Sequence, residues 1–294
     1  MLPAQAGPRH VRPTYDERER RPYTRIAPAP MSPTIGAEVG GVSLAEPLDD
    51  ETFAEIRRAL LEFKVIFFRD QDITPEQHVA FAGRFGELEV HPFIPHRDGH
   101  PEVVVLKKNA NMGGFENVWH SDVTWRLAPS LGSVLYAREV PAVGGDTLFS
   151  DMYAAYEGLD DETRAALDGL RAVHDFTHTF GHFLSDDELK KKQAEYPPAE
   201  HPVVRTHPET GRKGLYVNAA FTSHIVGMAR DASDRLLDHL YRQASVPEYQ
   251  CRFRWQPRSI AFWDNRAVQH YAASDYYPQR RLMERVTICG DVPR

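Results

Sequence analysis

The chain has 294 residues, 41% of them hydrophobic, which is enough for a sizeable core in one large β domain or in two smaller domains. Its formal net charge of −7 argues against a nucleic-acid partner, because surfaces that bind nucleic acid are usually basic. No run of about 18 apolar residues predicts a transmembrane helix, and the first residues lack the apolar core of a signal peptide. We therefore expect a cytoplasmic protein that contacts no membrane.

The two cysteines, Cys251 and Cys289, both lie in predicted strands. Their spacing is not that of a zinc site, and two cysteines make no disulfide framework. This usage fits a reducing, cytoplasmic setting.

The first 30 residues contain many Pro, Arg and Glu and few apolar side chains. Such a segment buries too little apolar surface to fold alone, so we expect a disordered or draped N-terminal arm over residues 1–30. A solvated tail and a subunit-contact arm are both open as roles for it. Residues 31–294 are expected to form a single domain.

Capping patterns predict two early helices. Asp50 is a candidate cap for a helix that runs to about Phe63. Thr74, followed by Pro and then by Gln77, predicts the start of a second helix, which Gly86 would end. Residues 65–68, Val-Ile-Phe-Phe, lie between them and predict a buried strand.

The rest of the chain predicts mainly short strands separated by turns. We expect strands within residues 35–44, 103–106, 133–140, 203–206, 214–217, 250–256, 259–263 and 282–289, and amphipathic helices at 152–157, 162–170 and 231–243. Many short strands of this kind suit a closed or double-sheet jelly roll with helices on its outside.

Three histidines, His174, His178 and His182, are spaced by four residues, as metal ligands on a helix can be. Gly181 and the neighbouring threonines disfavour a helix there. We therefore interpret residues 176–183 as a mobile loop near the pocket and not as a second metal site.

The stretch of residues 119–125, Trp-His-Ser-Asp-Val-Thr-Trp, contains the main chemical signal. Its β-branched and aromatic residues favour an extended chain, which would project His120 and Asp122 to the same side. With His270 they would supply two imidazoles and one carboxylate, the facial triad of non-haem Fe(II) oxygenases. His-x-Asp alone is a weak signal, so the assignment depends on further residues.

Two such features follow in the sequence. Arg281 and Arg285 come shortly after His270, and their even offset places both guanidiniums on one face of a strand. Arginine is suited to bidentate recognition of carboxylate or sulfonate. Residues 144–147, Gly-Gly-Asp-Thr, predict a tight turn that leads to the hydroxyl of Thr147.

Together these motifs resemble the taurine dioxygenase (TauD/TfdA) family. The resemblance extends from about Ile35 to Val292 and includes the strings at residues 73–75, 85–88, 201–208 and 263–266. It implies a cupin-like double-stranded β-helix, that is, a mainly β fold with peripheral helices. It also implies Fe(II) as metal, 2-oxoglutarate as co-substrate and O2.

The resemblance implies residue roles as well. His120, Asp122 and His270 would be the catalytic metal ligands, and Thr147 and Arg281 would bind 2-oxoglutarate. The reaction would hydroxylate the carbon that bears the sulfonate of taurine or a related alkylsulfonate, releasing sulfite, an aldehyde, succinate and CO2. The substrate-binding positions of the family fall on His91, Ile94, Asn117, the backbone amide of Val123, Thr179, Phe180, Phe221 and Arg285. We also expect a homo-oligomer, a dimer or a tetramer.

This chain departs from the family pattern at the amine end of the substrate. Ile94 stands where a Tyr is usual, Thr179 stands where a Ser is usual, and the family's Asn falls in the region of residues 116–118. The pocket end is thus more apolar, which keeps open an alkyl sulfate ester or another small anionic substrate. Arg285 in a structural ion pair and Phe221 in ordinary core packing are the alternatives for those two residues.

Two other classes of protein are consistent with the triad alone. One is a zinc hydrolase that uses the same His, Asp and His, and the other is a non-catalytic cupin-like protein. A zinc hydrolase would give Arg281 and Thr147 no role. A non-catalytic cupin-like protein would not require two arginines after the last histidine.

Overall fold

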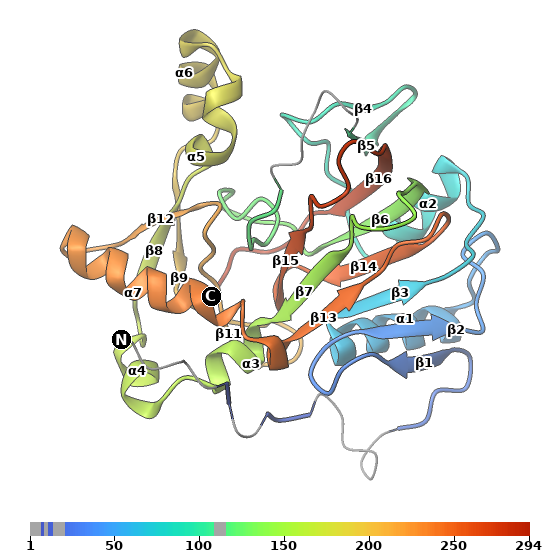
Figure 1. The fold of residues 1–294 in the computed structure, drawn as a ribbon, viewed down its shortest axis with the longest axis horizontal. Coiled ribbons are helices and arrows are strands. Elements are labelled where there is room, and N and C mark those ends of the chain that lie inside the picture. Colours follow the sequence, from blue (N-terminus) through green and yellow to red (C-terminus); the bar gives the residue numbers. More distant parts are fainter. Residues whose placement is uncertain (1–6, 9–10, 14–20, 109–115) are drawn as a thin grey trace.

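The computed structural model describes residues 7–8, 11–13, 21–108 and 116–294. Its main layer is an eight-stranded sheet with the order β1-β2-β3-β14-β6-β16-β5-β4 (Figure 1). Its strands are β1 (Ala27–Pro30), β2 (Ala37–Gly40), β3 (Val65–Phe68), β4 (His96–Arg97), β5 (His100–Lys108), β6 (Gly132–Glu139), β14 (Ile260–Asp264) and β16 (Arg281–Ile288). Among the described pairs, β2 with β3 is parallel and the others are antiparallel.

Three smaller antiparallel sheets complete the β structure. They have the orders β13-β7-β15, β12-β8-β9 and β10-β11. Their strands are β7 (Thr147–Asp151), β8 (Arg171–His174), β9 (Ala199–Pro202), β10 (Val204–Thr206), β11 (Lys213–Leu215), β12 (Thr222–Ile225), β13 (Gln250–Phe253) and β15 (Val268–Ala272). The predicted mainly β architecture is thus present, and the predicted hairpin joins β10 to β11.

Helices lie around the sheets (Figure 1). They are α1 (Asp50–Phe63), α2 (Pro75–Gly83), α3 (Met152–Glu157), α4 (Asp161–Ala166), α5 (Thr177–Phe180), α6 (Asp186–Glu195) and α7 (Arg230–Gln243), with short 3-10 turns η1 (Gly181–Phe183) and η2 (Pro247–Tyr249). No helix in the described part of the chain combines the length and the apolar character that crossing a membrane requires.

Both predicted helices are present, but the cap of the first and the end of the second differ from the prediction. The box at Thr74 and Gln77 is formed, with Thr74 N donating to Gln77 Oε1 at 2.7 Å. Helix α1 is capped by Asp49 and not by Asp50, because Asp49 Oδ1 accepts from Thr52 N at 2.7 Å and residue 50 is already helical. Helix α2 ends at Gly83, three residues before the predicted stop.

One core fills the space between the main sheet and the β13-β7-β15 sheet. Phe67 of β3 stacks on Phe253 of β13 with ring centroids 4.0 Å apart, and it meets Phe149 of β7 edge-on at 5.5 Å. Burying each such ring stabilises the fold by about 1.5–3 kcal/mol. A second core lies on the other face of the main sheet, under α1 and α2.

The N-terminal arm can be described only in part. Ala27–Pro30, within the predicted arm, pair with β2 as strand β1, so the sheet begins before residue 31. Just before it, Arg58 of α1 donates to the carbonyls of Arg21 and Pro22 at 2.9 and 3.0 Å. The prediction for residues 1–6, 9–10 and 14–20 lies outside the described residues. The cysteine prediction holds for Cys251 in β13, whereas Cys289 follows the end of β16 and is exposed.

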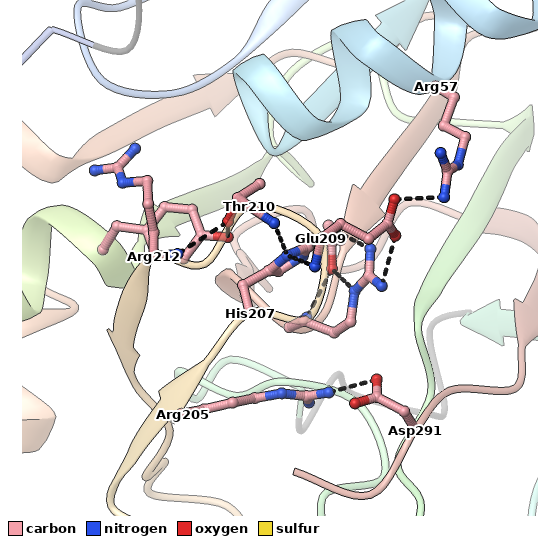
Figure 2. Close-up of polar contacts among 10 residues, drawn as sticks. Arg57, Arg205, His207, Glu209, Thr210, Arg212 and Asp291 are labelled. Atoms are coloured by element: carbon pink, nitrogen blue, oxygen red, sulfur yellow. Dashed lines mark hydrogen bonds and ion pairs between the residues drawn. The ribbon is translucent and has the colours of Figure 1, made fainter. Parts of the chain in front are cut away.

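A buried ion network joins the β10-β11 hairpin to the turn after β14 (Figure 2). Asp264 accepts from Arg266 Nε and Nη2 at 2.8 and 2.7 Å and contacts His207 Nε2 at 3.0 Å. Glu209 at the hairpin tip bridges Arg266, at 2.9 Å, and Arg57 of α1, at 2.5 Å. The network fixes the turn from which β15 starts.

Candidate active site

Two histidines from distant parts of the chain are paired through their backbones. His120 N donates to His270 O at 3.1 Å, and His270 N donates to His120 O at 2.7 Å. Residues directly opposite each other in an antiparallel pair carry their side chains on the same face. The two imidazole centroids are accordingly 4.1 Å apart. Strand β15 thus positions both rings.

The next residues form a turn, so the predicted strand over residues 119–125 is wrong. Val123 has φ of 48°, in the left-handed region that β-branched residues rarely adopt. The strand preference of this stretch is overridden by tertiary contacts, among them a hydrogen bond from Asp122 N to Asn265 Oδ1 at 3.2 Å. The turn nevertheless brings the Asp122 carboxylate beside both rings.

His120, Asp122 and His270 offer ligand atoms that all lie within 4.8 Å of one another. The two Nε2 atoms are 4.0 and 3.9 Å from Asp122 Oδ1. Across the residues that the structure describes, this is the one group of three or more His, Cys, Asp or Glu that could hold a metal ion. Two imidazoles and one carboxylate are the donor set of the Fe(II) facial triad.

The protonation states fit metal binding. His120 Nδ1 lies 2.8 Å from the Val118 carbonyl and therefore carries the proton, which leaves the Nε2 lone pair for a metal. Burial and the adjacent His120 lower the pKa of His270 to about 3, so this ring is neutral, as a ligand must be. His270 Nδ1 is buried and has no hydrogen-bond partner within the described chain.

The Asp122 carboxylate has two side-chain partners. Ser133 Oγ donates to Oδ2 at 2.9 Å, and Arg285 Nη1 donates to Oδ1 at 2.8 Å. Burial favours the neutral acid, but the Arg285 guanidinium, helped by the Ser133 hydrogen bond, outweighs it and holds the pKa of Asp122 below its usual range. The carboxylate is therefore charged and available as a ligand.

Ser133 and Asn265 both contact Asp122, although no sequence pattern predicts a role for either side chain. Asn265 belongs to the family motif at residues 263–266. That motif pointed to this part of the chain but not to the hydrogen bond between Asn265 and the backbone of Asp122. Its Oδ1 also accepts from Trp263 Nε1 at 2.9 Å, and its Nδ2 donates to Ser130 Oγ at 2.9 Å. Every polar atom of this amide side chain is thus used to fix the turn of Asp122.

Arg281 is a buried cation that pairs with no acid among the described residues. It is 7% exposed, and it makes no hydrogen bond or ion pair with any residue that the structure describes. A guanidinium stays protonated in proteins, so an anion is the natural occupant beside it. Thr147 lines the same cavity as Arg281, and its Oγ1 accepts from Trp255 Nε1 at 2.9 Å. The hydroxyl hydrogen of Thr147 is left to donate to another group.

A cavity of about 1400 Å³ opens on the triad. Its wall contains the triad residues, Thr147 and Arg281, and all but one of the predicted substrate residues: His91, Ile94, Val123, Thr179, Phe180, Phe221 and Arg285. The exception is Asn117, which is exposed and outside the lining, whereas its neighbours Glu116 and Val118 line the cavity. The chain here turns alternate residues inward, so residue 117 points away.

His91 presents a neutral N–H to this cavity. The backbone amides of Phe93 and Ile94 donate to its Nδ1 at 3.2 Å each, so the ring proton is on Nε2. Burial and the nearby Arg285 lower the pKa of His91 to about 3. The ring can therefore donate a hydrogen bond but carries no charge.

Residues 177–183 form α5 and η1, so the prediction of a loop is wrong at this point. Helices α5 and α6 project from the body of the molecule at one end (Figure 1). Phe180 of α5 stacks on Phe93 with centroids 5.0 Å apart and planes inclined by 15°. This aromatic contact places Thr179 and Phe180 on the cavity wall. Of the three spaced histidines, His174 is buried in β8 and the other two are exposed.

Comparisons with known proteins agree with this geometry. Residues 27–287 match the family described as "Taurine catabolism dioxygenase TauD, TfdA family". An alpha-ketoglutarate-dependent sulfate ester dioxygenase of Pseudomonas putida is 37% identical over 90% of this chain and 89% of its own. An (S)-phenoxypropionate/alpha-ketoglutarate-dioxygenase of Sphingobium herbicidovorans is 36% identical over 90% of this chain and 94% of its own. The crystal structure of a taurine dioxygenase from Burkholderia xenovorans superimposes with a TM-score of 0.80, at 42% identity, covering 92% of this chain and 93% of that one.

The fold and the site define an enzyme that depends on Fe(II), 2-oxoglutarate and O2, namely a 2-oxoglutarate-dependent dioxygenase. The chain belongs to the TauD/TfdA family.

Proposed function

We propose that this dioxygenase hydroxylates the carbon next to a sulfur oxyanion, in an alkyl sulfate ester or an alkylsulfonate with an apolar chain. The observation that carries the proposal is the group of donors beside the triad: the Arg285 guanidinium, the His91 N–H and the Val123 backbone amide line one cavity. The relatives named above for sulfate esters and taurine support the choice of a sulfur anion.

We assign His120, Asp122 and His270 as the residues that hold Fe(II). The chemistry that Fe(II), 2-oxoglutarate and O2 supply when bound is oxidative decarboxylation coupled to hydroxylation of a nearby C–H bond. The protein's part is to bind, orient and exclude water. Ser133 and Asn265 keep the Asp122 carboxylate in place, and the His120–His270 backbone pair fixes both rings.

For 2-oxoglutarate, we assign Arg281 and Thr147 to the carboxylate that lies farther from the metal. Arg281 is a buried cation with no acid partner in the described chain, and Thr147 has a hydroxyl hydrogen to donate. A carboxylate would satisfy both groups at once. Charge-assisted hydrogen bonds of this kind are worth about 1.5–3 kcal/mol each.

For the substrate anion, Arg285 retains donors beyond the one that contacts Asp122, since within the described residues its Nη1 is the only guanidinium nitrogen with a hydrogen bond. The ion pair that was the alternative role of Arg285 is therefore present, but it leaves part of the guanidinium for a ligand. His91 adds a neutral donor, so the site offers a single positive charge that Asp122 partly offsets. This balance suits a monoanion such as a sulfonate or a sulfate monoester.

For the rest of the substrate, the cavity wall is mainly apolar away from the donors. Ile94, Val118, Phe180 and Phe221 line it. Each buried CH2 contributes about 0.8 kcal/mol, roughly fourfold in affinity. Because Ile94 supplies no hydrogen bond for an ammonium, we expect an alkyl chain to bind better than the amine end of taurine.

The test is a comparison of four candidate substrates in the presence of Fe(II), 2-oxoglutarate and air. These are hexyl sulfate, hexanesulfonate, taurine and 2-phenoxypropionate, with hexanol as the neutral control. Succinate formation is measured with release of sulfate or sulfite. We expect both hexyl anions to stimulate succinate formation more than taurine does, with sulfate released from the ester and sulfite from the sulfonate, and hexanol to have no effect.

The proposal is wrong if 2-phenoxypropionate stimulates succinate formation and none of the sulfur anions does. In that case the dioxygenase class stands and the substrate is a carboxylate, as the name of the Sphingobium relative indicates for that protein. If taurine is the best of the four, the sulfur anion is right and the apolar chain is wrong.

We also infer that the main sheet and the β13-β7-β15 sheet together form the double-stranded β-helix. The single domain over residues 31–294, the cytoplasmic location and the dimer or tetramer remain predictions. The contribution of Asn117 to substrate binding is a prediction that its exposure does not support.

A further inference from the structure

Val123 follows the ligand Asp122 in an unusual backbone conformation. Its φ is 48°, its side chain is 3% exposed, and it lines the cavity. Its N–H has no acceptor among the residues that the structure describes. A β-branched residue leaves the left-handed region unless its surroundings hold it there, and such residues are found at functional sites.

The next residue, Thr124, is held by a buried polar network. Asn218 Nδ2 donates to Thr124 Oγ1 at 3.0 Å, and His174 Nδ1 lies 3.0 Å from the same oxygen. The Thr124 hydroxyl thus forms hydrogen bonds with both Asn218 and His174. All three side chains are at most 1% exposed, so water does not compete for these bonds.

A second histidine fixes the backbone of the turn. His201 Nε2 lies 2.9 Å from the carbonyls of both Thr124 and Arg126, so it carries the proton and donates to both. Arg126 N in turn donates to Val123 O at 3.0 Å. Burial lowers the pKa of His201 to about 4 and that of His174 well below its ordinary value, so both rings are neutral.

The same network reaches two further residues of the cavity wall, Phe221 and Ala220. Phe221 N donates to Asn218 Oδ1 at 3.0 Å, and Thr179 Oγ1 donates to the neighbouring Ala220 carbonyl at 2.7 Å. Asn218 therefore links the backbone of Phe221 to the turn of Val123. One amide side chain joins two parts of the proposed substrate site.

We propose that Asn218, His174 and His201 are positioning residues that act through Thr124 to hold Val123 in its left-handed conformation, with its N–H directed at the substrate anion. This inference rests on the proposed function and deepens it. The network touches neither the metal ligands' side chains nor Arg281. Loss of the network should therefore affect the substrate and not 2-oxoglutarate.

The variants are Thr124→Val, which keeps the shape but removes the hydroxyl, and Thr124→Ser, which keeps the hydroxyl. The matched control is Ser233→Ala, because Ser233 is a buried hydroxyl that accepts from Ile225 N at 2.9 Å but does not line the cavity. Should Thr124→Val not fold, His174→Phe takes its place: it removes the contacts of this ring with Thr124 and Thr222 and keeps the Thr124 hydroxyl.

Two readouts are measured. The first is the KM for hexyl sulfate against the KM for 2-oxoglutarate. We expect Thr124→Val to raise the former about tenfold, the worth of one hydrogen bond to an anion, and to leave the latter within about twofold. Thr124→Ser should restore the wild-type value, and Ser233→Ala should lower the Tm without moving either KM. The second readout is the amide NMR signal of Val123 in 15N-valine-labelled metal-free protein, which hexyl sulfate should shift in the wild type and not in Thr124→Val.

The network is merely structural, and the inference wrong, if Thr124→Val changes both KM values alike or behaves as Ser233→Ala does. The inference also fails if hexyl sulfate stimulates turnover but leaves the wild-type Val123 amide unmoved, and the proposed function then stands. If the amide shifts without any turnover of sulfur anions, the network stands and the proposed reaction fails. If neither occurs, both are wrong.

Discussion

Arg281 and Arg285 show how one strand can give two identical side chains different tasks. They lie four residues apart on β16, are both buried, and line the same cavity, as their even offset predicted. Arg285 contacts the Asp122 carboxylate at 2.8 Å, whereas Arg281 has no acid partner within the described chain. The sequence could predict the shared face, but not this difference in partners, because Asp122 is 163 residues away.

Arg281→Ala tests the assignment of 2-oxoglutarate. Removal of the only cation proposed for its far carboxylate should raise the KM for 2-oxoglutarate about ten- to hundredfold, which corresponds to about 1.5–3 kcal/mol. The KM for the preferred sulfur anion should change much less. Both constants are measured from succinate formation.

The matched control is Arg280→Ala, which removes the neighbouring arginine. Arg280 is 61% exposed in its side chain and lies 3.6 Å from the half-exposed Glu139, so its loss should leave both constants unchanged. An unaltered KM for 2-oxoglutarate in Arg281→Ala would assign Arg281 to a structural role.

At the scale of elements, the helices and strands with strong local signals could be predicted, and the turns that carry function could not. The Thr74 capping box and the apolar run of β3 are local features, and both are confirmed. Residues 122–125 are rich in strand-forming residues but form a turn, since contacts with Asn265 and His201 outweigh local preference. Those contacts depend on the completed fold.

The network of Figure 2 is another element-scale feature that local signals do not reveal. Asp264 is 1% exposed and accepts three hydrogen bonds from Arg266, one from its backbone N and two from its guanidinium. Burial raises the pKa of Asp264, but Arg266 and His207 outweigh it and hold the pKa below its usual range. The carboxylate is therefore charged at neutral pH, and its partners depend on that charge.

Asp264→Asn should lower the free energy of unfolding by about 3–5 kcal/mol at pH 7, because it leaves the buried Arg266 without its main counter-charge. Urea unfolding measures the change. The control is Asp234→Asn, which breaks the exposed Arg230–Asp234 pair on α7 and should cost less than about 0.5 kcal/mol. Equal losses in the two variants would mean that the network of Asp264 contributes no more than a surface pair.

At the scale of the whole molecule, the candidate site exists only where distant segments meet. His120 and His270 are joined by an isolated backbone pair, and the cavity wall takes residues from β5, β7, β15, β16 and the α5–α6 segment. The motifs identified most of these residues one by one. Their convergence follows from the pairing of β15 with β7 and of β16 with β5 and β6, which no local pattern specifies.

The whole molecule also buries histidines that do not belong to the triad, and these predict how its stability depends on pH. Burial lowers the pKa of His78 and of His201 to about 4, and that of His174 well below its ordinary value. In the unfolded chain each ring titrates near about 6.5. The neutral rings thus contribute fully to the free energy of unfolding above a pH of about 6.5. This contribution is lost as the pH falls from about 6.5 to about 4.

Between those limits the unfolded chain binds about three more protons than the folded one through these rings, so they make the free energy of unfolding fall by about 4 kcal/mol per pH unit near pH 5. His91 and, in the metal-free protein, His270 add to this fall, because their pKa values are lowered to about 3. Urea unfolding of the metal-free protein at a series of pH values measures the slope. His78→Gln removes one ring that does not line the cavity, and should reduce the slope by about 1.4 kcal/mol per pH unit. His182→Gln replaces an exposed ring, leaves the three buried rings in place and should not alter the slope.

The carboxyl of Asp264, whose pKa is lowered in the folded state, cannot mimic this effect, because its contribution is lost only below the unfolded pKa of about 3.9. A free energy of unfolding that stays flat between pH 6.5 and about 4.5 would mean that these rings take up protons within the fold.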